Sequence, residues 1–187
     1  FVEDLPPRVV FCFDEAYAEY MERSPDLTPF IREGRSVIAT RTFSKIYGLA
    51  GLRVGFGYGA EPIVSLLHRA RQPFSVNSLA LCAAEAALDD EAFVRTSRAC
   101  NRKGILQLEE GLGRLGLEVD AGHSNFVLVK VGDVDGVCER LLGMGVIVRS
   151  MEPFSLDGRI RVSVGSEEEN ARFLNAISEL QADPSAS

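Results

Sequence analysis

The first part of the chain contains three short, continuous apolar runs that are rich in β-forming residues. They cover residues 9–13 (VVFCF), 36–40 (SVIAT) and 52–58 (LRVGFGY). A continuous apolar run bounded by turn residues is typical of a strand that is buried on both faces of a parallel sheet. Asp14, which follows the first run, should then lie at the carboxyl edge of that sheet. The pattern therefore predicts an α/β unit with a mostly parallel sheet and helical or irregular links.

A helical periodicity replaces these runs further along the chain. Pro62 opens a segment in which apolar residues recur on one face of a helix, and this helix should end before Pro73. A second, alanine-rich helical stretch runs from Ser78 to about Leu115. We expect it to break at Asp89–Asp90 and again at Gly104. A helical segment of this length is expected to connect two domains.

The last part of the chain mixes both periods. Strands are predicted at 125–131, 146–149 and 159–164, and a helical stripe lies between the first two of them. Ser166 and Glu169 form a capping box ahead of a final helix. The pattern predicts an α+β small C-terminal domain at 91–187, after a larger α/β domain at 1–90.

Composition narrows the class of protein. The 187 residues are 46% hydrophobic and carry a net charge of -7 from acids spread along the sequence. A spread of acids does not favour a nucleic-acid partner. No run approaches the roughly 18 apolar residues of a membrane helix, and the start lacks the order of a signal peptide. We therefore expect no membrane association and a cytoplasmic location.

The cysteines and histidines do not form a metal-binding pattern. Neither a CxxC pair nor a His spacing typical of a zinc site occurs, so no metal is expected. Apolar neighbours surround the cysteines, which are therefore expected to be buried thiols. They are Cys12, Cys82, Cys100 and Cys138.

The segment from Thr40 to Gly59 (TRTFSKIYGLAGLRVGFGYG) is the most unusual part of the sequence. Hydroxyls, one lysine and two arginines stand among glycines and apolar residues. Glycine lets a backbone approach a ligand closely, and hydroxyls with a guanidinium suit an anion such as phosphate. Neither the P-loop spacing nor the dinucleotide GxGxxG frame is present. A glycine-rich connection with an incidental lysine remains the alternative on composition alone.

Two motifs in order carry a resemblance to a known family. DEAYAEY at 14–20 and TFSKIYGLAGLRVG at 42–55 resemble the cofactor segments of fold-type I, pyridoxal-phosphate-dependent aminotransferases, and most of all the histidinol-phosphate aminotransferase group. The likeness runs over most of residues 8–180 and implies an enzyme. Members are about twice as long, so the chain looks like the C-terminal half of one: the C-terminal part of the large domain plus the small domain.

The resemblance implies a role for each matching residue. Lys45 would carry pyridoxal 5'-phosphate and then move the substrate proton, while Asp14 would pair with the ring nitrogen. Tyr17 would reach the phenolic oxygen of the cofactor. The phosphate would be held by a last group of side chains, Thr42, Ser44 and Arg53.

Substrate binding is expected in the second domain. Arg161 resembles the arginine that grips the acidic group of the substrate, with Arg149 as its neighbour. The implied reaction converts histidinol phosphate and 2-oxoglutarate to imidazole-acetol phosphate and glutamate in a homodimer. Aromatic amino-acid transamination and a phosphothreonine-type decarboxylation on the same fold stay open, as does a truncated module that only dimerises.

Overall fold

A computed structural model describes residues 1–182 of the chain as two compact units. The first unit covers Phe1–Thr96 and the second begins at Ser97. The division falls inside one long helix, a few residues beyond the 90/91 boundary expected from the sequence. Each unit has its own sheet and its own core, and the two are described separately.

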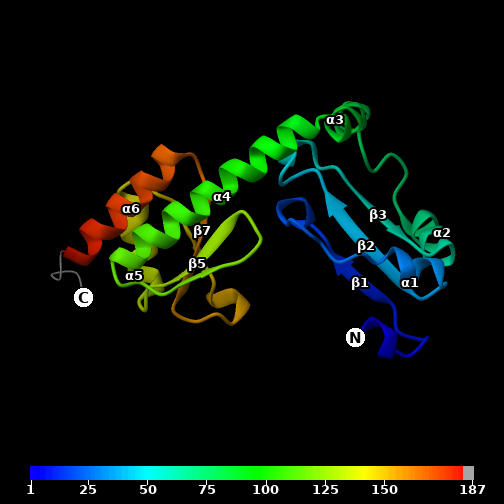
Figure 1. Ribbon diagram of the computed structural model, residues 1–187, viewed down its shortest axis with the longest axis horizontal. Helices are drawn as coiled ribbons and strands as arrows, with labels where there is room; N and C mark the ends of the chain where they lie inside the picture. The colour runs from blue at the N-terminus through cyan, green and yellow to red at the C-terminus, as the bar shows by residue number, and fades with distance from the viewer. Residues whose placement is uncertain (183–187) are drawn as a thin grey trace. The chain divides into compact units, whose positions relative to one another are not determined.

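The first unit is built on a three-stranded sheet in the order β1-β2-β3 (Figure 1). Its strands are β1 Phe11–Asp14, β2 Val37–Thr42 and β3 Gly55–Gly59. β1 and β2 run parallel, as expected, but β2 and β3 are antiparallel. The expectation that the three runs are buried on both faces is wrong for β1 and β3, which expose residues on one face or most of their length. The connection between β2 and β3 is a compact turn with no crossover helix, so it can only reverse the chain.

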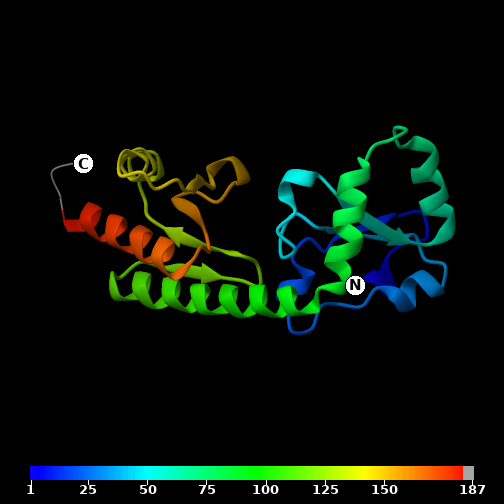
Figure 2. The same ribbon diagram turned by 90° about the horizontal axis from the view of Figure 1, so that it is seen from above.

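Strand alternation assigns different side chains to the two faces of this sheet. Phe13, Ala39 and Tyr58 occupy one face, where α1 (Thr28–Arg32) adds Phe30 and Ile31 to a small core. The three glycines of β3 point to the other face, which α2 (Glu61–Ala70) covers. Figure 2 shows α1 and α2 on opposite sides of the sheet. The sequence had given no signal for the short α1.

Two helices follow α2 in the sequence, α3 (Ser78–Asp89) and α4 (Glu91–Arg114). The predicted break at Asp89–Asp90 is confirmed, whereas the predicted break at Gly104 is wrong. Gly104 is buried inside α4, and a Cβ there would collide with Val164. Glycine therefore serves close packing at this position and does not end the helix.

Short 3-10 turns complete the first unit. They cover Val2–Asp4, Ala18–Tyr20 and Ala50–Leu52. The last two of these turns flank the strand ends on which the candidate site is built.

The second unit contains a four-stranded antiparallel sheet in the order β4-β5-β7-β6. Its strands are β4 Val119–Ala121, β5 Phe126–Lys130, β6 Arg149–Ser150 and β7 Arg159–Ser163. One face forms the core with α4, α5 (Val134–Gly143) and α6 (Glu167–Ala182), around the fully buried Val129 and Ile160. β4 was not predicted, and the strand expected at 146–149 pairs only from Arg149. A 3-10 turn at Glu152–Phe154 follows β6.

The start of α6 follows the local sequence signal. Glu169 accepts a hydrogen bond from the Ser166 backbone N–H (2.8 Å), and Ser166 Oγ accepts one from Glu169 N–H (3.2 Å). These reciprocal bonds satisfy N–H groups that a helix start leaves free. The predicted capping box is therefore confirmed.

The expectation of buried cysteines is wrong. Cys12, Cys82 and Cys100 are exposed and Cys138 is partly buried. Cys12 shows the reason, because it alternates with the apolar Phe11 and Phe13 and so lies on the face of β1 opposite their core. Among the described residues no helix has both the length and the apolar character needed to cross a membrane.

Candidate active site

Lys45 lies in the turn that follows β2, and apolar side chains fix this turn from both sides. Phe43 and Ile46 are 4% and 2% exposed. Phe43 packs with Val54 and with Ala80 of α3, and its backbone N–H donates to Val54 O at 3.1 Å. A loop held by buried neighbours keeps a functional side chain in a defined place. Lys45 itself is partly exposed.

The amine of Lys45 stands over the ring of Tyr17. Nζ is 5.3 Å from the ring centroid, a distance at which a cation is attracted by the ring face. Within residues 1–182 no acid forms an ion pair with Lys45. The amine is therefore oriented by an aromatic face without being tied to a carboxylate.

Asp14 ends β1 directly opposite Thr40 of β2. Its Oδ1 accepts a hydrogen bond of 3.0 Å from Ala16 N–H, a local turn that starts the segment leading to Tyr17. The carboxylate is exposed at the carboxyl edge of the parallel pair, as the sequence predicted. Asp14 and Tyr17 thus come from one strand end and Lys45 from the neighbouring one.

Thr42, Ser44 and Arg53, the residues expected to hold the cofactor phosphate, lie close together. Thr42 Oγ1 accepts from Ser44 N–H at 3.0 Å, and Arg53 Nη1 lies 3.5 Å from Ser44 Oγ. The same guanidinium donates to Ala50 O at 2.9 Å. Arg53 adopts φ 54°, a left-handed conformation that is costly for a side chain with a Cβ. Such strain concentrates at functional sites, and here the strained residue places its guanidinium beside the Ser44 hydroxyl.

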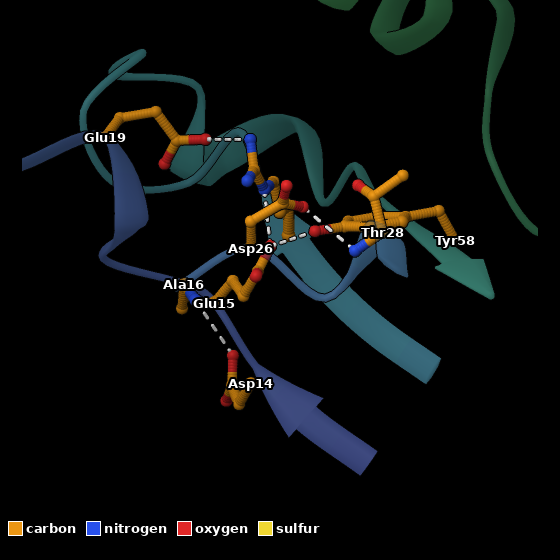
Figure 3. A network of polar contacts seen from close by, with 8 residues as sticks. Asp14, Glu15, Ala16, Glu19, Asp26, Thr28 and Tyr58 are labelled. Carbon is orange, nitrogen blue, oxygen red and sulfur yellow. Dashed lines mark hydrogen bonds and ion pairs between the residues drawn. The ribbon is translucent and has the colours of Figure 1, made fainter. Parts of the chain in front are cut away.

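Glu15, to which the sequence motifs assign no cofactor role, is the centre of a buried network (Figure 3). Its side chain is 1% exposed, and Oε2 accepts from Arg41 Nε and from Tyr58 OH, both at 2.7 Å. Arg41 also lies 3.6 Å from Glu19. The alternation of side chains along a strand could have placed both residues on one face of the sheet. Glu15 continues the face of Phe13, and Arg41 continues that of Ala39, which pairs with Phe13.

This network changes the titration of its members. Burial raises the pKa of Tyr58, and the hydrogen bond to Glu15 raises it further. Burial opposes the charge of Arg41, but Glu15 outweighs it and raises the pKa of that guanidinium. The pKa of Tyr47 is also raised, by burial and by Glu19. At neutral pH the phenols are therefore hydrogen-bond donors beside a fixed arginine cation.

In the second unit, Arg161 and Arg149 are direct cross-strand partners. Their Cα atoms are paired between β7 and β6, and both lie on the sheet face opposite the core. Each guanidinium stacks on an aromatic ring, at 5.1 Å from Phe126 and 4.9 Å from Phe154. Neither arginine forms an ion pair with any described residue. Two like charges on paired positions repel each other, and a shared anion would relieve this repulsion.

Comparisons with known proteins agree with the motifs. Residues 6–177 match the family Aminotransferase class I and II. Histidinol-phosphate aminotransferase 1 of Thiobacillus denitrificans is 48% identical over 184 residues, which are 97% of this chain and 48% of that protein. The Akkermansia muciniphila histidinol-phosphate aminotransferase is 45% identical over 180 residues, 96% of this chain and 50% of that protein. The chain spans about half the length of the curated relatives that it matches.

Solved structures confirm the expected fold class. Histidinol-phosphate aminotransferase from Sinorhizobium meliloti, in complex with pyridoxal-5'-phosphate, has a TM-score of 0.87 and 27% identity, over 95% of this chain and 50% of that one. L-threonine-O-3-phosphate decarboxylase from Porphyromonas gingivalis has a TM-score of 0.82 over 95% of this chain and 56% of that one, but its 22% identity shows the fold alone. With 6–177 matched and this fold, the chain belongs to the family of class I and II aminotransferases.

Proposed function

We propose that this chain is the part of a pyridoxal-phosphate-dependent aminotransferase that carries the cofactor on Lys45. The observation that carries the proposal is the Lys45 amine, 5.3 Å from the Tyr17 ring centroid on a turn anchored by Phe43 and Ile46. No described acid neutralises this amine. In our proposal residues 1–90 belong to the cofactor-binding large domain and residues 91–187 form the small domain.

The residues of the first unit fit this cofactor by their chemistry. Arg53 has no acidic partner among the described residues, so its remaining N–H groups can bind a phosphate dianion beside the Thr42 and Ser44 hydroxyls. The Asp14 carboxylate would keep the ring nitrogen protonated, and the Tyr17 hydroxyl would donate to the phenolic oxygen. Pyridoxal phosphate, when bound, supplies a ring that takes up the electron pair freed at the substrate Cα.

Lys45 would perform the proton transfer. Its Nζ would take the proton from the substrate Cα as a general base and would then deliver it to C4' of the cofactor as a general acid. Stacking on Tyr17 limits the positions that the amine can adopt. A proton carrier is effective only when it is held within reach of its target.

The substrate proposed is histidinol phosphate, with 2-oxoglutarate as acceptor, giving imidazole-acetol phosphate and glutamate. The relatives named above support this choice. The Arg149–Arg161 pair also supports it, because a guanidinium fork binds a phosphate or a carboxylate, and one site can serve both substrates in turn. We propose that the enzyme works as a cytoplasmic homodimer.

Trapping the cofactor on a specific lysine tests this proposal. The chain has three lysines, Lys45, Lys103 and Lys130, so borohydride reduction with pyridoxal phosphate followed by peptide mapping identifies the attachment site. We expect the adduct on Lys45, with an absorbance band at about 400 nm before reduction. Lys45→Ala should lose both signals, while Lys103→Ala and Lys130→Ala should keep them.

Two outcomes contradict the proposal: an adduct that survives in Lys45→Ala, and no adduct on the parent chain. Where the parent is loaded, the substrate is assigned by comparing amino donors. Glutamate formed from 2-oxoglutarate with histidinol phosphate supports the proposed reaction. A faster reaction with phenylalanine, or release of carbon dioxide from phosphothreonine, would replace it by one of the two alternatives.

A further inference from the structure

Glu15 is not one of the residues that we propose to contact the cofactor. It follows Asp14 directly, and strand alternation turns the two carboxylates to opposite faces of the sheet. Asp14 stays at the exposed edge, while Glu15 is buried against Arg41 of β2 and Tyr58 of β3 (Figure 3). A single carboxylate oxygen therefore links the end of β1 to β2 and β3.

The ends of β1 and β2 carry the proposed cofactor residues. Glu15 lies between Asp14 and Tyr17 on one side, and its backbone N–H donates to Thr40 O at 2.8 Å. Arg41 directly precedes Thr42 and the turn of Lys45. Any movement of the Glu15–Arg41 pair would shift both segments relative to each other.

All four tyrosines of the chain lie in this unit, and they surround the same acids and arginine. Tyr58 bonds Glu15, and the Arg41 guanidinium stands 5.7 Å over the Tyr58 ring. Tyr17 packs on Tyr20. Burial raises the pKa of Tyr20 and of Tyr47, and Glu19 raises both pKa values further. Arg41 also pairs with Glu19, which directly precedes Tyr20, and Tyr20 packs on the Tyr17 ring below the Lys45 amine.

Stability alone is a weak reason for such a network. A buried ion pair often contributes little net stability, because the desolvation of its charges offsets their attraction. Glu15 also keeps a buried oxygen, Oε1, without a hydrogen-bond partner among the described residues. Native proteins seldom leave such an atom unpaired, so the full stabilisation that a satisfied carboxylate could contribute is not reached here.

We propose that Glu15 is a positioning residue of the cofactor site. It fixes Arg41 and Tyr58, and through them holds the Asp14–Tyr17 segment and the Thr42–Gly48 segment in one geometry. The proposal rests on the proposed function for its purpose. The mechanical part, in which Glu15 keeps these two segments in place, can be measured without any cofactor.

Amide hydrogen exchange on the cofactor-free chain measures that part. Glu15→Gln keeps the shape of the side chain but removes the charge that Arg41 and Tyr58 share. We expect exchange at residues 14–17 and 42–48 to become about tenfold faster, because a charge-assisted hydrogen bond is lost and local opening follows. Exchange in α2 should stay unchanged. The matched control is Glu33→Gln, which removes the partner of Arg35 from an exposed pair (side chains 36% and 58% exposed).

Cofactor binding gives the second measurement. Glu15→Gln should bind pyridoxal phosphate about tenfold more weakly than the parent and shift the pH midpoint of its absorbance band. A general loss of stability would not move that midpoint as long as the variant is folded, which its cooperative unfolding would show. If the parent does not bind the cofactor, the proposed function fails for this chain, while hydrogen exchange still decides the role of Glu15.

The outcomes that overturn the inference are defined in advance. Unchanged exchange in both segments, or equal acceleration across the whole first unit, would show that Glu15 positions nothing in particular. Binding by Glu15→Gln within about twofold of a binding parent would do the same. If Glu15→Gln does not fold, Tyr58→Phe replaces it, because this variant keeps the ion pair. It should loosen the same two segments by about threefold, and no change there would also refute the proposal.

Discussion

Arg41 Nε lies 2.7 Å from Oε2 of Glu15, and the two side chains are 28% and 1% exposed. The pair joins an almost fully buried acid to a base that still reaches solvent. The arginine balances the charge of this buried acid, and the arginine and a phenol both donate to one of its oxygens. Removing the arginine would leave that charge buried with only a neutral donor.

The first prediction concerns this asymmetry. Arg41→Gln should lower the free energy of unfolding by about 2–3 kcal/mol, below the full cost of breaking a buried pair because Arg41 is partly exposed. Urea unfolding measures the change. Arg95→Gln is the control, since its pair with Glu91 is 66% and 81% exposed and should matter by less than about 0.5 kcal/mol. Equal effects of the two substitutions would contradict the importance of burial here.

The second prediction concerns alkaline pH. The pKa of Tyr58 is raised in the folded chain by burial and by Glu15, so the unfolded chain loses this proton first. Its contribution to stability is complete below the unfolded pKa of about 10 and is lost as the pH rises through the folded pKa. The pKa values of Tyr20 and Tyr47 are raised too and act in the same direction. Stability should therefore fall with increasing pH above about 10.

Tyr58→Phe measures how much Tyr58 contributes to the pH dependence of stability. The free energy of unfolding, measured in urea at several alkaline pH values, should fall less steeply in Tyr58→Phe than in the parent. At neutral pH the variant should be less stable by about 1 kcal/mol, because Glu15 loses a donor. Identical slopes in the two proteins would assign the pH dependence to other groups.

The sequence predicted the elements whose signals are local. α2 begins with Pro62 near its first position, and α6 begins at a capping box whose two bonds are both present. The order of Asp14, Tyr17, Lys45 and Arg53 also pointed to the family that the comparisons confirm. Such signals depend on residues a few positions apart, so the sequence alone contains them.

Features that depend on distant residues could not be predicted in the same way. Apolar runs give strand positions but not direction, and the antiparallel pairing of β3 follows from the fold of its turn. Gly104 looks like a helix break until Val164, sixty positions later, is found against it. Glu15 belongs to no local motif that would show its contacts, because its partners Arg41 and Tyr58 come from two other strands.

The third prediction tests this reading of Gly104. A Cβ at Gly104 would collide with Val164 and would lie 2.9 Å from Asn170 Nδ2, whereas a Cβ at Gly113 of the same helix meets nothing within 4 Å. Gly104→Ala should therefore destabilise the chain by about 1–3 kcal/mol through overpacking. Gly113→Ala should stabilise it by up to about 1 kcal/mol, since alanine favours a helix. Thermal unfolding of both variants measures the difference, and a stabilising Gly104→Ala would show that α4 and α6 are not packed at contact.

The last prediction concerns the paired arginines of the second unit. Arg159 and Arg161 lie on the same face of β7, and Arg159 is held 2.7 Å from Glu118. Within residues 1–182, Arg161 has no acidic partner and lies beside the Phe126 ring and the opposing Arg149. A phosphate ion should therefore bind at Arg161. Inorganic phosphate at about a hundred times its dissociation constant would stabilise the parent by about 2.7 kcal/mol. Arg161→Gln should remove most of that gain in a thermal unfolding assay at constant ionic strength.

Arg159→Gln is the matched control, because it removes the same charge from the same strand face. It should keep the phosphate effect and lose only the ion pairs with Glu118 and Asp120. Arg159 and Lys130 hold the pKa of Glu118 below its usual value. An equal loss in both variants would mean that the stabilisation by phosphate depends on the total charge of the sheet and not on Arg161 in particular. In that case Arg161 would not be a substrate-binding fork, and the anion site of the proposed reaction would have to lie among other residues.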